Sequence, residues 1–467
     1  MALVYGNPRD CLRRVVDFRK SAFREIEKRF PEKTWLKTSL RKIKKVVLIN
    51  SSSRSGSSLL FSALRKIPGI YSLSGESVPF YKLNNLSFGR FASDEIPQDT
   101  AVNPGILSDL SRDFISDLSV AGGENNIFKD SLLAEECIED IVLRLPMQWP
   151  QICFSYNSLK NLVTEAFASY RDTGKDFCKE EFYLELLSSL MQRYKIINPY
   201  YYDLPVRMIK SRFPELEIPS GPPNNMLTIE EPPFIMLSPR AKATEADILG
   251  NTLLLKTSID AYRMEFLASF FPEAQIKTIQ LVRNPLGCIN GLCDGWLHRG
   301  FFSHNLQSFI PTAGNSVKML KISGYSELSE WGKWWWNYDL PAGWQDYIDK
   351  PLEEVCAFQW YSSNKAIQEY LAIRGENRCL IRYEDLIKGL GARIQEIERI
   401  MDFMGVSRQC IGQLGLENLP VVQATEEPRP FRWKNRQEKL LPLLQMSQIR
   451  EMCLQLGYDK DNFGEWF

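Results

Sequence analysis

The chain has almost no histidine and no excess of charge of either sign. Its 467 residues include only His298 and His304, and the ten cysteines form no C-x-x-C pair. A zinc site with the usual ligand spacing is therefore not expected. Lysine plus arginine and aspartate plus glutamate both total 57. This balance argues against a nucleic-acid-binding protein and against a general membrane-surface binder.

Long apolar runs are missing as well. No stretch reaches the roughly 20 apolar residues of a membrane span, and the opening residues MALVYGNPRD hold no signal-peptide core. We therefore expect a cytosolic protein whose cysteines are reduced. No G-x-x-x-x-G-K-S/T sequence occurs, which argues against hydrolysis of ATP or GTP at a Walker A loop.

What the chain does contain is an alternation of short apolar runs with helical patterns. Hydrophobic residues make up 44% and charged residues 24%, which is enough apolar material for a large core. The runs that predict strands are 46–50, 70–74, 252–256, 276–282 and 379–383. Strands that alternate with helices predict an α/β fold, a three-layer parallel sheet with helices on both faces.

Three regions stand outside this alternation. Residues 1–45 form an amphipathic pattern and are expected to be an N-terminal helical flank of a domain spanning 46–467. Residues 80–250 mix helical patterns with proline-rich stretches, and so long a segment between core strands predicts a large insertion. The tryptophan-rich segment 331–344 is expected to pack in the core or in a lid.

The loop 51–58, SSSRSGSS, follows the first expected strand and directly precedes a helical pattern. A strand, a small polar turn and a helix together aim backbone N–H groups at one point, which attracts a phosphate or sulfate oxygen. Gly56 permits close backbone approach, and Arg54 adds a fixed positive fork. An ordinary serine-rich connection is the alternative.

Other polar residues also end expected strands. Glu76, Lys256 and Arg283 each follow or close an apolar run. Ligands of parallel sheets bind outside the carboxyl ends of the strands, so we expect these residues to share a cleft with the loop 51–58.

Several motifs, in this order along the chain, resemble the sulfotransferases that use 3′-phosphoadenosine 5′-phosphosulfate (PAPS). They are SSRSGSS, then LLLKTS with LASFFPEAQIKTIQLVRNPLGCIN, then IRYEDL, and finally RPFRWKNR. The resemblance covers roughly residues 46–76 and 250–450 and implies a P-loop-NTPase-like sulfotransferase fold. Residues 80–250 would then be a lid or an acceptor-binding insertion.

The resemblance assigns donor-binding residues one by one. The 5′-phosphosulfate would be held by Arg54, Ser55, Gly56, Ser57 and Ser58. Arg283 would bind the 3′-phosphate, Lys256 would lie near the sulfuryl group, and Arg432 and Lys434 would reach the nucleotide. The desulfated product is adenosine 3′,5′-bisphosphate (PAP), and no metal is required.

Two positions depart from the family pattern. The family usually has serine where this chain has Gly291, so that contact is missing or is supplied by a neighbour such as Asn290. Cytosolic members usually have their histidine base where this chain has Ser258. Golgi tyrosylprotein and several bacterial sulfotransferases resemble this chain more closely in the RSG…GE pattern, which makes Glu76 the expected base. A helix cap or a surface carboxylate is the alternative for Glu76.

The resemblance predicts transfer of a sulfuryl group from PAPS to a hydroxyl or amine of a small-molecule acceptor, with natural products among the candidates. A divergent P-loop kinase is one alternative, but it needs a Walker lysine and a magnesium-binding aspartate that are not found where expected. A non-catalytic nucleotide-binding protein on the same fold is the other. The oligomeric state is not predicted.

Overall fold

The computed structural model describes residues 7–30, 38–97, 102–123, 127–224, 226–231, 236–307, 318–375, 377–459 and 466. Its centre is a seven-stranded sheet in the order β4-β3-β2-β5-β1-β6-β9. The strands are β1 Lys45–Asn50, β2 Ile70–Leu73, β3 Leu118–Gly123, β4 Arg240–Lys242, β5 Thr252–Lys256, β6 Gln275–Val282 and β9 Arg378–Arg382. Neighbouring strands are parallel except at β3, which runs antiparallel to both β2 and β4. The expected α/β sheet is confirmed, and all five predicted strands are present.

Both faces of the sheet are covered by helices, as the continuous apolar sequence of β1 predicts. Val46 and Leu48 pack in one cluster with α3 Val78–Leu83, α4 Pro104–Asp117 and α10 Met264–Phe270. Val47 and Ile49 point the other way, toward α2 Ser57–Leu64 and α14 Leu390–Met404. Successive strand residues alternate between faces, so a strand that is apolar throughout belongs in the middle layer.

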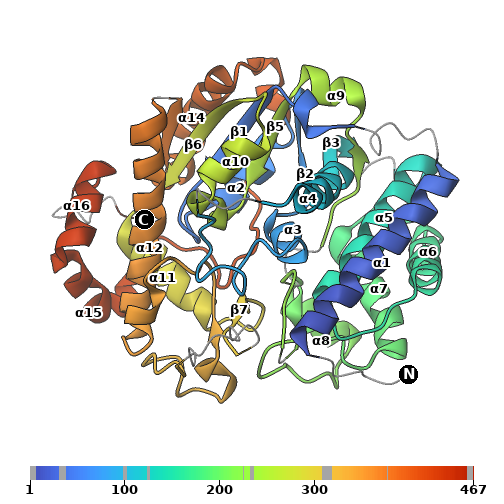
Figure 1. Ribbon diagram of the computed structural model, residues 1–467, viewed down its shortest axis with the longest axis horizontal. Coiled ribbons are helices and arrows are strands. Elements are labelled where there is room, and N and C mark those ends of the chain that lie inside the picture. The colour runs from blue at the N-terminus through green and yellow to red at the C-terminus, as the bar shows by residue number, and fades with distance from the viewer. Residues whose placement is uncertain are drawn as a thin grey trace.

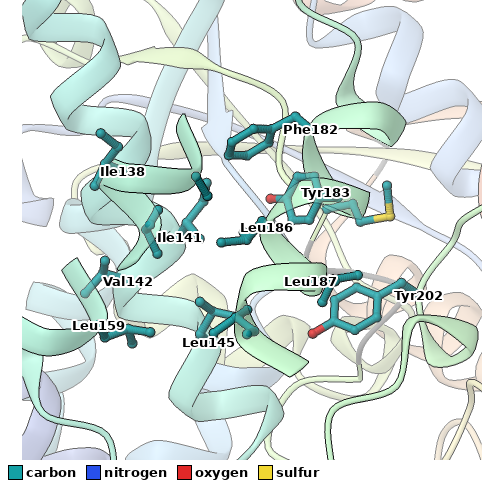
Figure 2. Close-up of a cluster of buried hydrophobic side chains, with 14 of the residues drawn as sticks. Ile138, Ile141, Val142, Leu145, Leu159, Phe182, Tyr183, Leu186, Leu187 and Tyr202 are labelled. Carbon is teal, nitrogen blue, oxygen red and sulfur yellow. The ribbon is translucent and has the colours of Figure 1, made fainter. Parts of the chain in front are cut away.

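A block of helices stands beyond the end of the sheet that β3 and β4 form (Figure 1). It contains α1 Pro8–Arg29, α5 Ser131–Gln148, α6 Tyr156–Arg171, α7 Lys179–Arg193 and α8 Val206–Arg212. Figure 2 shows Ile138, Ile141 and Leu145 facing Leu186 and Leu187 across its core. The expected flank and much of the segment 80–250 thus share one hydrophobic cluster, while β3 and β4 of that segment join the central sheet.

A second group of helices lies at the other end of the molecule in Figure 1. It contains α11 Pro285–Trp296, α12 Leu352–Arg374, α15 Gln437–Leu440 and α16 Ser447–Gln455. Trp336 and Trp344 of the tryptophan-rich segment are buried in its cluster, which confirms that this segment packs in the core. The short strands β7 His304–Asn305 and β8 Trp335–Trp336 form a separate pair.

The remaining elements are short. They are α9 Glu245–Gly250 and α13 Tyr383–Ile387, with 3-10 turns at Leu40–Lys42, Pro199–Tyr201, Ser258–Tyr262, Trp331–Lys333, Trp344–Tyr347, Arg408–Gln413, Arg432–Arg436 and Leu441–Gln445. Nowhere in the described parts of the chain is a helix both long and apolar enough to cross a membrane.

Candidate active site

A cavity of about 490 Å³ opens at the carboxyl ends of β1, β2, β5 and β6. The sequence-predicted site residues that line it are Arg54, Gly56, Ser57, Ser58, Glu76, Lys256, Arg283, Asn290 and Arg432. The strand-end residues therefore do share one cleft, and their roles in binding and chemistry stay predictions. Ser55 and Lys434 do not line the cavity.

The loop between β1 and α2 has the curved backbone of an anion-binding turn. Arg54 and Gly56 are both left-handed, with φ of 69° and 92°. Alternating right- and left-handed residues turn successive N–H groups toward one concave side. A Cβ atom on Gly56 would lie 2.3 Å from the ring of Tyr383. Only glycine fits both the dihedral angle and this contact.

The serines of the loop differ in position: Ser55 makes contacts within the protein, and Ser58 lies at the cavity. The Ser55 hydroxyl lies 3.4 Å from Cys288 Sγ, and the Ser55 N–H donates to the Ser52 carbonyl oxygen. Ser55 therefore shapes the loop here. Ser58 faces the cavity, where its hydroxyl contacts Lys256 Nζ at 2.9 Å.

Glu76 and Lys256 come together because they end neighbouring parallel strands, β2 and β5. Lys256 Nζ forms an ion pair with Glu76 Oε1 and donates to Ser58 Oγ. The Lys256 and Glu76 side chains are only 7% and 15% exposed. Lys256 thus bridges the loop and the carboxylate predicted as the base, and both side chains are largely buried.

Residues of the segment 80–250 fix the turn that carries Glu76. Asp117 Oδ2 accepts from the N–H groups of Ser74 and Gly75 at 3.0 and 3.4 Å. Arg144 donates to Asp117 Oδ1 at 2.6 Å and pairs with Glu230. A Cβ atom on Gly75 would lie 2.5 Å from Arg144 Nη1. The glycine before Glu76 is therefore required by the packing of this guanidinium.

Arg283 follows β6 and lies beside the loop. Its Nη1 donates to the Arg54 carbonyl oxygen at 3.1 Å, and its guanidinium lies 4.6 Å from the centre of the Tyr383 ring. Its Nε is buried and has no hydrogen-bond partner among the described residues. A buried guanidinium donor without a partner, in a residue that lines a cavity, is what a bound anion would complete.

The IRYEDL motif holds the turn after β6. Glu384 Oε1 accepts from both the backbone N–H and the side-chain amide of Asn284, at 3.0 and 2.6 Å. Asn284 in turn caps α11 by accepting from the Gly287 N–H at 2.7 Å. Two motifs far apart in sequence thus form one unit that places Arg283.

The structure gives a physical reason for Gly291. A Cβ atom there would lie 3.2 Å from Arg54 Cβ and 3.9 Å from Arg283 Nη1, so the space used by a serine is taken by Arg54. Asn290 donates to Asp294 and accepts from Arg436. The side-chain amide of Asn290 is thus hydrogen-bonded to other side chains of the protein, although the residue lines the cavity.

A tail strap, residues 419–433, covers the loop. Arg54 Nη1 donates to the Gln423 carbonyl oxygen at 2.9 Å, and Ser58 donates to Gln423 Oε1 at 2.8 Å. Gln423 has the left-handed φ of 51°. The backbone and side-chain oxygens of Gln423 thus accept hydrogen bonds from two donors, Arg54 and Ser58, that a bound anion would use. Arg432 lines the cavity and pairs with Asp294, whereas the Lys434 ammonium lies 4.4 Å from the Phe431 ring centre.

Sequence reasoning missed a group of charged residues in the same cavity. These are Lys82, Asp94, Glu230 and Glu231, and His304 joins them. His304 Nε2 lies 3.5 Å from Asp94 Oδ2. His298 does not line the cavity; its Nδ1 accepts from the Gly300 N–H, and burial lowers the pKa of its ring to about 4. In the part of the chain that the structure describes, no cluster of three His, Cys, Asp or Glu side chains could hold a metal ion.

Comparison with known proteins gives only distant likenesses. No protein-family model matches the chain, and no curated protein matches it. Among solved structures, the sulfotransferase domain from the curacin biosynthetic pathway is 14% identical, with 89% of this chain and 99% of that chain covered and a TM-score of 0.33. The sulfotransferase domain of a Synechococcus olefin synthase is 13% identical (89% and 96% covered, TM-score 0.35).

A sulfotransferase of Mycobacterium avium is also 13% identical, with 96% of this chain and 86% of that chain covered and a TM-score of 0.35. Likenesses this low assign neither a fold nor a function to the chain.

Proposed function

We propose that the protein is a sulfotransferase that moves a sulfuryl group from PAPS to a hydroxyl or amine of a small-molecule acceptor. The observation that carries this proposal is the bridge made by Lys256 between Ser58 and Glu76, in a cavity that Arg54 and Arg283 also line. The motifs of the sequence support it. The catalytic unit would comprise residues 46–467.

The residues present fit a donor with anionic groups at both ends. The left-handed turn at Arg54 and Gly56 offers a cradle for the 5′-phosphosulfate. Arg283, whose Nε has no partner in the part of the chain that the structure describes, offers a site for the 3′-phosphate. When bound, PAPS supplies the sulfuryl group. No serine is needed at position 291, because Arg54 fills that space.

The chain's own residues would contribute charge stabilisation, positioning and proton transfer. An ammonium group has three N–H donors, and Lys256 uses two of them on Ser58 and Glu76. The third is left for an anionic oxygen on the leaving side, where Arg54 adds a second cation. Glu76, facing the same point, accepts the proton of the acceptor.

The test is the variant Glu76→Gln, compared with the surface variant Glu417→Gln. Turnover, measured as PAP release with PAPS and a panel of alcohol and amine acceptors, should fall on the order of a hundredfold or more in Glu76→Gln. PAP affinity, measured by calorimetry, should stay within about twofold, because a neutral isostere keeps the cavity shape.

Retained turnover in Glu76→Gln would move the base to another residue, of which His304 is the first candidate. PAP binding without transfer to any acceptor would indicate a non-catalytic binding protein. Magnesium-dependent ATP turnover without PAP binding would contradict the proposal in favour of a kinase.

A further inference from the structure

The cavity has a basic side and an acidic side, and the sheet order places them. Along the strand ends run Glu76 after β2, Lys256 on β5, the loop after β1, and Arg283 after β6. The basic side, at β1 and β6, is lined by Arg54, Arg283, Arg429 and Arg432. The acidic side lies beyond Glu76, where Arg144 packs on Gly75 and holds Glu230, the neighbour of Glu231.

Glu230 carries an oxygen with no partner. Its side chain is about 1% exposed and pairs with Arg144 through Oε1. Its Oε2 is buried and has no hydrogen-bond partner among the described residues, although the residue lines the cavity. Arg144 is also shared with Asp117, so two carboxylates face one guanidinium.

Glu231 has one nearby cation, Lys82, whose charge opposes the effect of burial on its pKa. Its Oε1 accepts from the Ser303 hydroxyl at 2.7 Å. The nearby Lys82 ammonium donates to the carbonyl oxygens of Thr228 and Ser303 at 2.8 and 3.1 Å. Burial raises the pKa of both Glu230 and Glu231 to about 7, and the negative charge of Glu76 adds to this effect.

A purely structural role does not account for this arrangement. A buried carboxylate oxygen without a partner is unfavourable, and a surplus of buried negative charge more so. The missing partner is a hydrogen-bond donor that carries positive charge. Since the two glutamates line the cavity into which Glu76 also faces, that donor would enter with the acceptor.

We propose, as an inference that rests on the function proposed above, that the acceptor carries a protonated amine. Glu230 and Glu231 bind this amine, while a separate hydroxyl of the acceptor is presented to Glu76. The two groups must differ, because a protonated amine has no lone pair with which to attack sulfur. The reaction would therefore be O-sulfation of an amino alcohol. The acceptor's O–H proton would pass to Glu76 and the acceptor oxygen would bond to sulfur, while the bond from sulfur to the 5′-phosphate oxygen breaks and PAP leaves.

The test uses pairs in which acetylation removes the positive charge of the amine: 6-aminohexan-1-ol, tyramine and glucosamine, each against its N-acetyl derivative. Binding is measured by calorimetry with and without saturating PAP, in the wild type, Glu231→Gln, Glu230→Gln and the exposed control Glu217→Gln. We expect at least one amine to bind roughly tenfold or more tightly than its N-acetyl partner, as for a charge-assisted hydrogen bond. The preference should fall to about twofold in Glu231→Gln and persist in Glu217→Gln.

Equal or weaker binding of all three amines would overturn the inference, as would a preference that survives both Glu231→Gln and Glu230→Gln. PAP binding and sulfuryl transfer in the same preparations report separately on the proposed function. Loss of the amine preference with PAP binding intact would refute only the acceptor class. An amine preference without any PAP binding would support the carboxylate site and refute the sulfotransferase.

Discussion

The basic and acidic sides of the cavity are built in different ways. On the basic side, Arg54 and Arg283 belong to short local motifs, each placed by the strand that precedes it, while Arg429 and Arg432 come from the tail strap. The acidic side is assembled from α3, α4, α5 and the chain around residue 230, held by the buried Asp117–Arg144–Glu230 network. Among the described residues, Arg283 has a buried donor without a partner on the first side, and Glu230 has a buried acceptor without a partner on the second. The first side depends mainly on local backbone geometry and the second on tertiary packing.

Substitutions on the two sides of the cavity should differ most in their effect on the stability of the protein. Arg144→Met should destabilise the protein by about 3–5 kcal/mol, because it leaves two buried carboxylates without their cation. Arg283→Ala should cost less, about 0.5–1.5 kcal/mol, the loss of one hydrogen bond to the loop. Chemical denaturation of both, with the exposed Arg207→Met as control, measures the difference. An Arg144→Met protein as stable as the wild type would show that the network does not hold the acidic side.

The next effect is on donor binding. Arg283→Ala should weaken PAP binding by roughly 10- to 100-fold, the loss of one charge-assisted contact to a phosphate. Binding of 5′-AMP, which lacks the 3′-phosphate, should hardly change. Calorimetric titration of both nucleotides tests this, with Arg450→Ala as a surface control. Equal losses for PAP and 5′-AMP would mean that Arg283 does not bind the 3′-phosphate.

The affinity of the acidic side for an amine should depend on pH. The pKa of about 7 for Glu230 and Glu231 means that both gain negative charge between pH 6 and 8. The facing groups are Arg144, Asp117, Arg19 and Glu76 for Glu230, and Lys82, Ser303 and Glu76 for Glu231. Affinity for 6-aminohexan-1-ol, which stays protonated, should therefore rise across this range by up to about tenfold. The rise should be smaller in Glu231→Gln; an affinity that falls with pH would contradict the assignment.

The smallest effect concerns the tail strap. Gln423→Gly removes the side-chain oxygen that Ser58 contacts and suits the left-handed backbone. We expect PAP affinity to rise roughly threefold, because the donor no longer competes with that oxygen. Val421→Ala, at a strap position that is 68% exposed, serves as the control. Weaker PAP binding in Gln423→Gly would mean that the residue contacts the donor rather than competing with it.

Much of the sheet could be predicted from the sequence. The strands β1, β5 and β6 are β-branched or leucine-rich runs buried on both faces, which is a strong local signal. The strands β3 and β4 were not predicted, because LSVAGG contains two glycines and RAK is short and basic. They join the sheet through tertiary packing.

The site residues fall into the same two groups: those placed by a local motif could be predicted from the sequence, and those placed by tertiary packing could not. The loop 51–58, Lys256 and Arg283 follow strands directly, so the sequence placed them in one cleft. Glu230 and Glu231 follow no expected strand, and nothing local distinguishes them from surface carboxylates. Arg432 and Lys434 were predicted from one motif; Arg432 lines the cavity and Lys434 does not.

A crystal structure of the protein with PAP tests the central claim most directly. The account predicts the 5′-phosphate on the backbone of residues 54–58 and the 3′-phosphate on Arg283. It also predicts that the Gln423 side chain leaves Ser58 and that Glu76 faces open cavity beside Lys256. An empty cleft at saturating PAP, or a nucleotide held away from both Arg54 and Arg283, would contradict it.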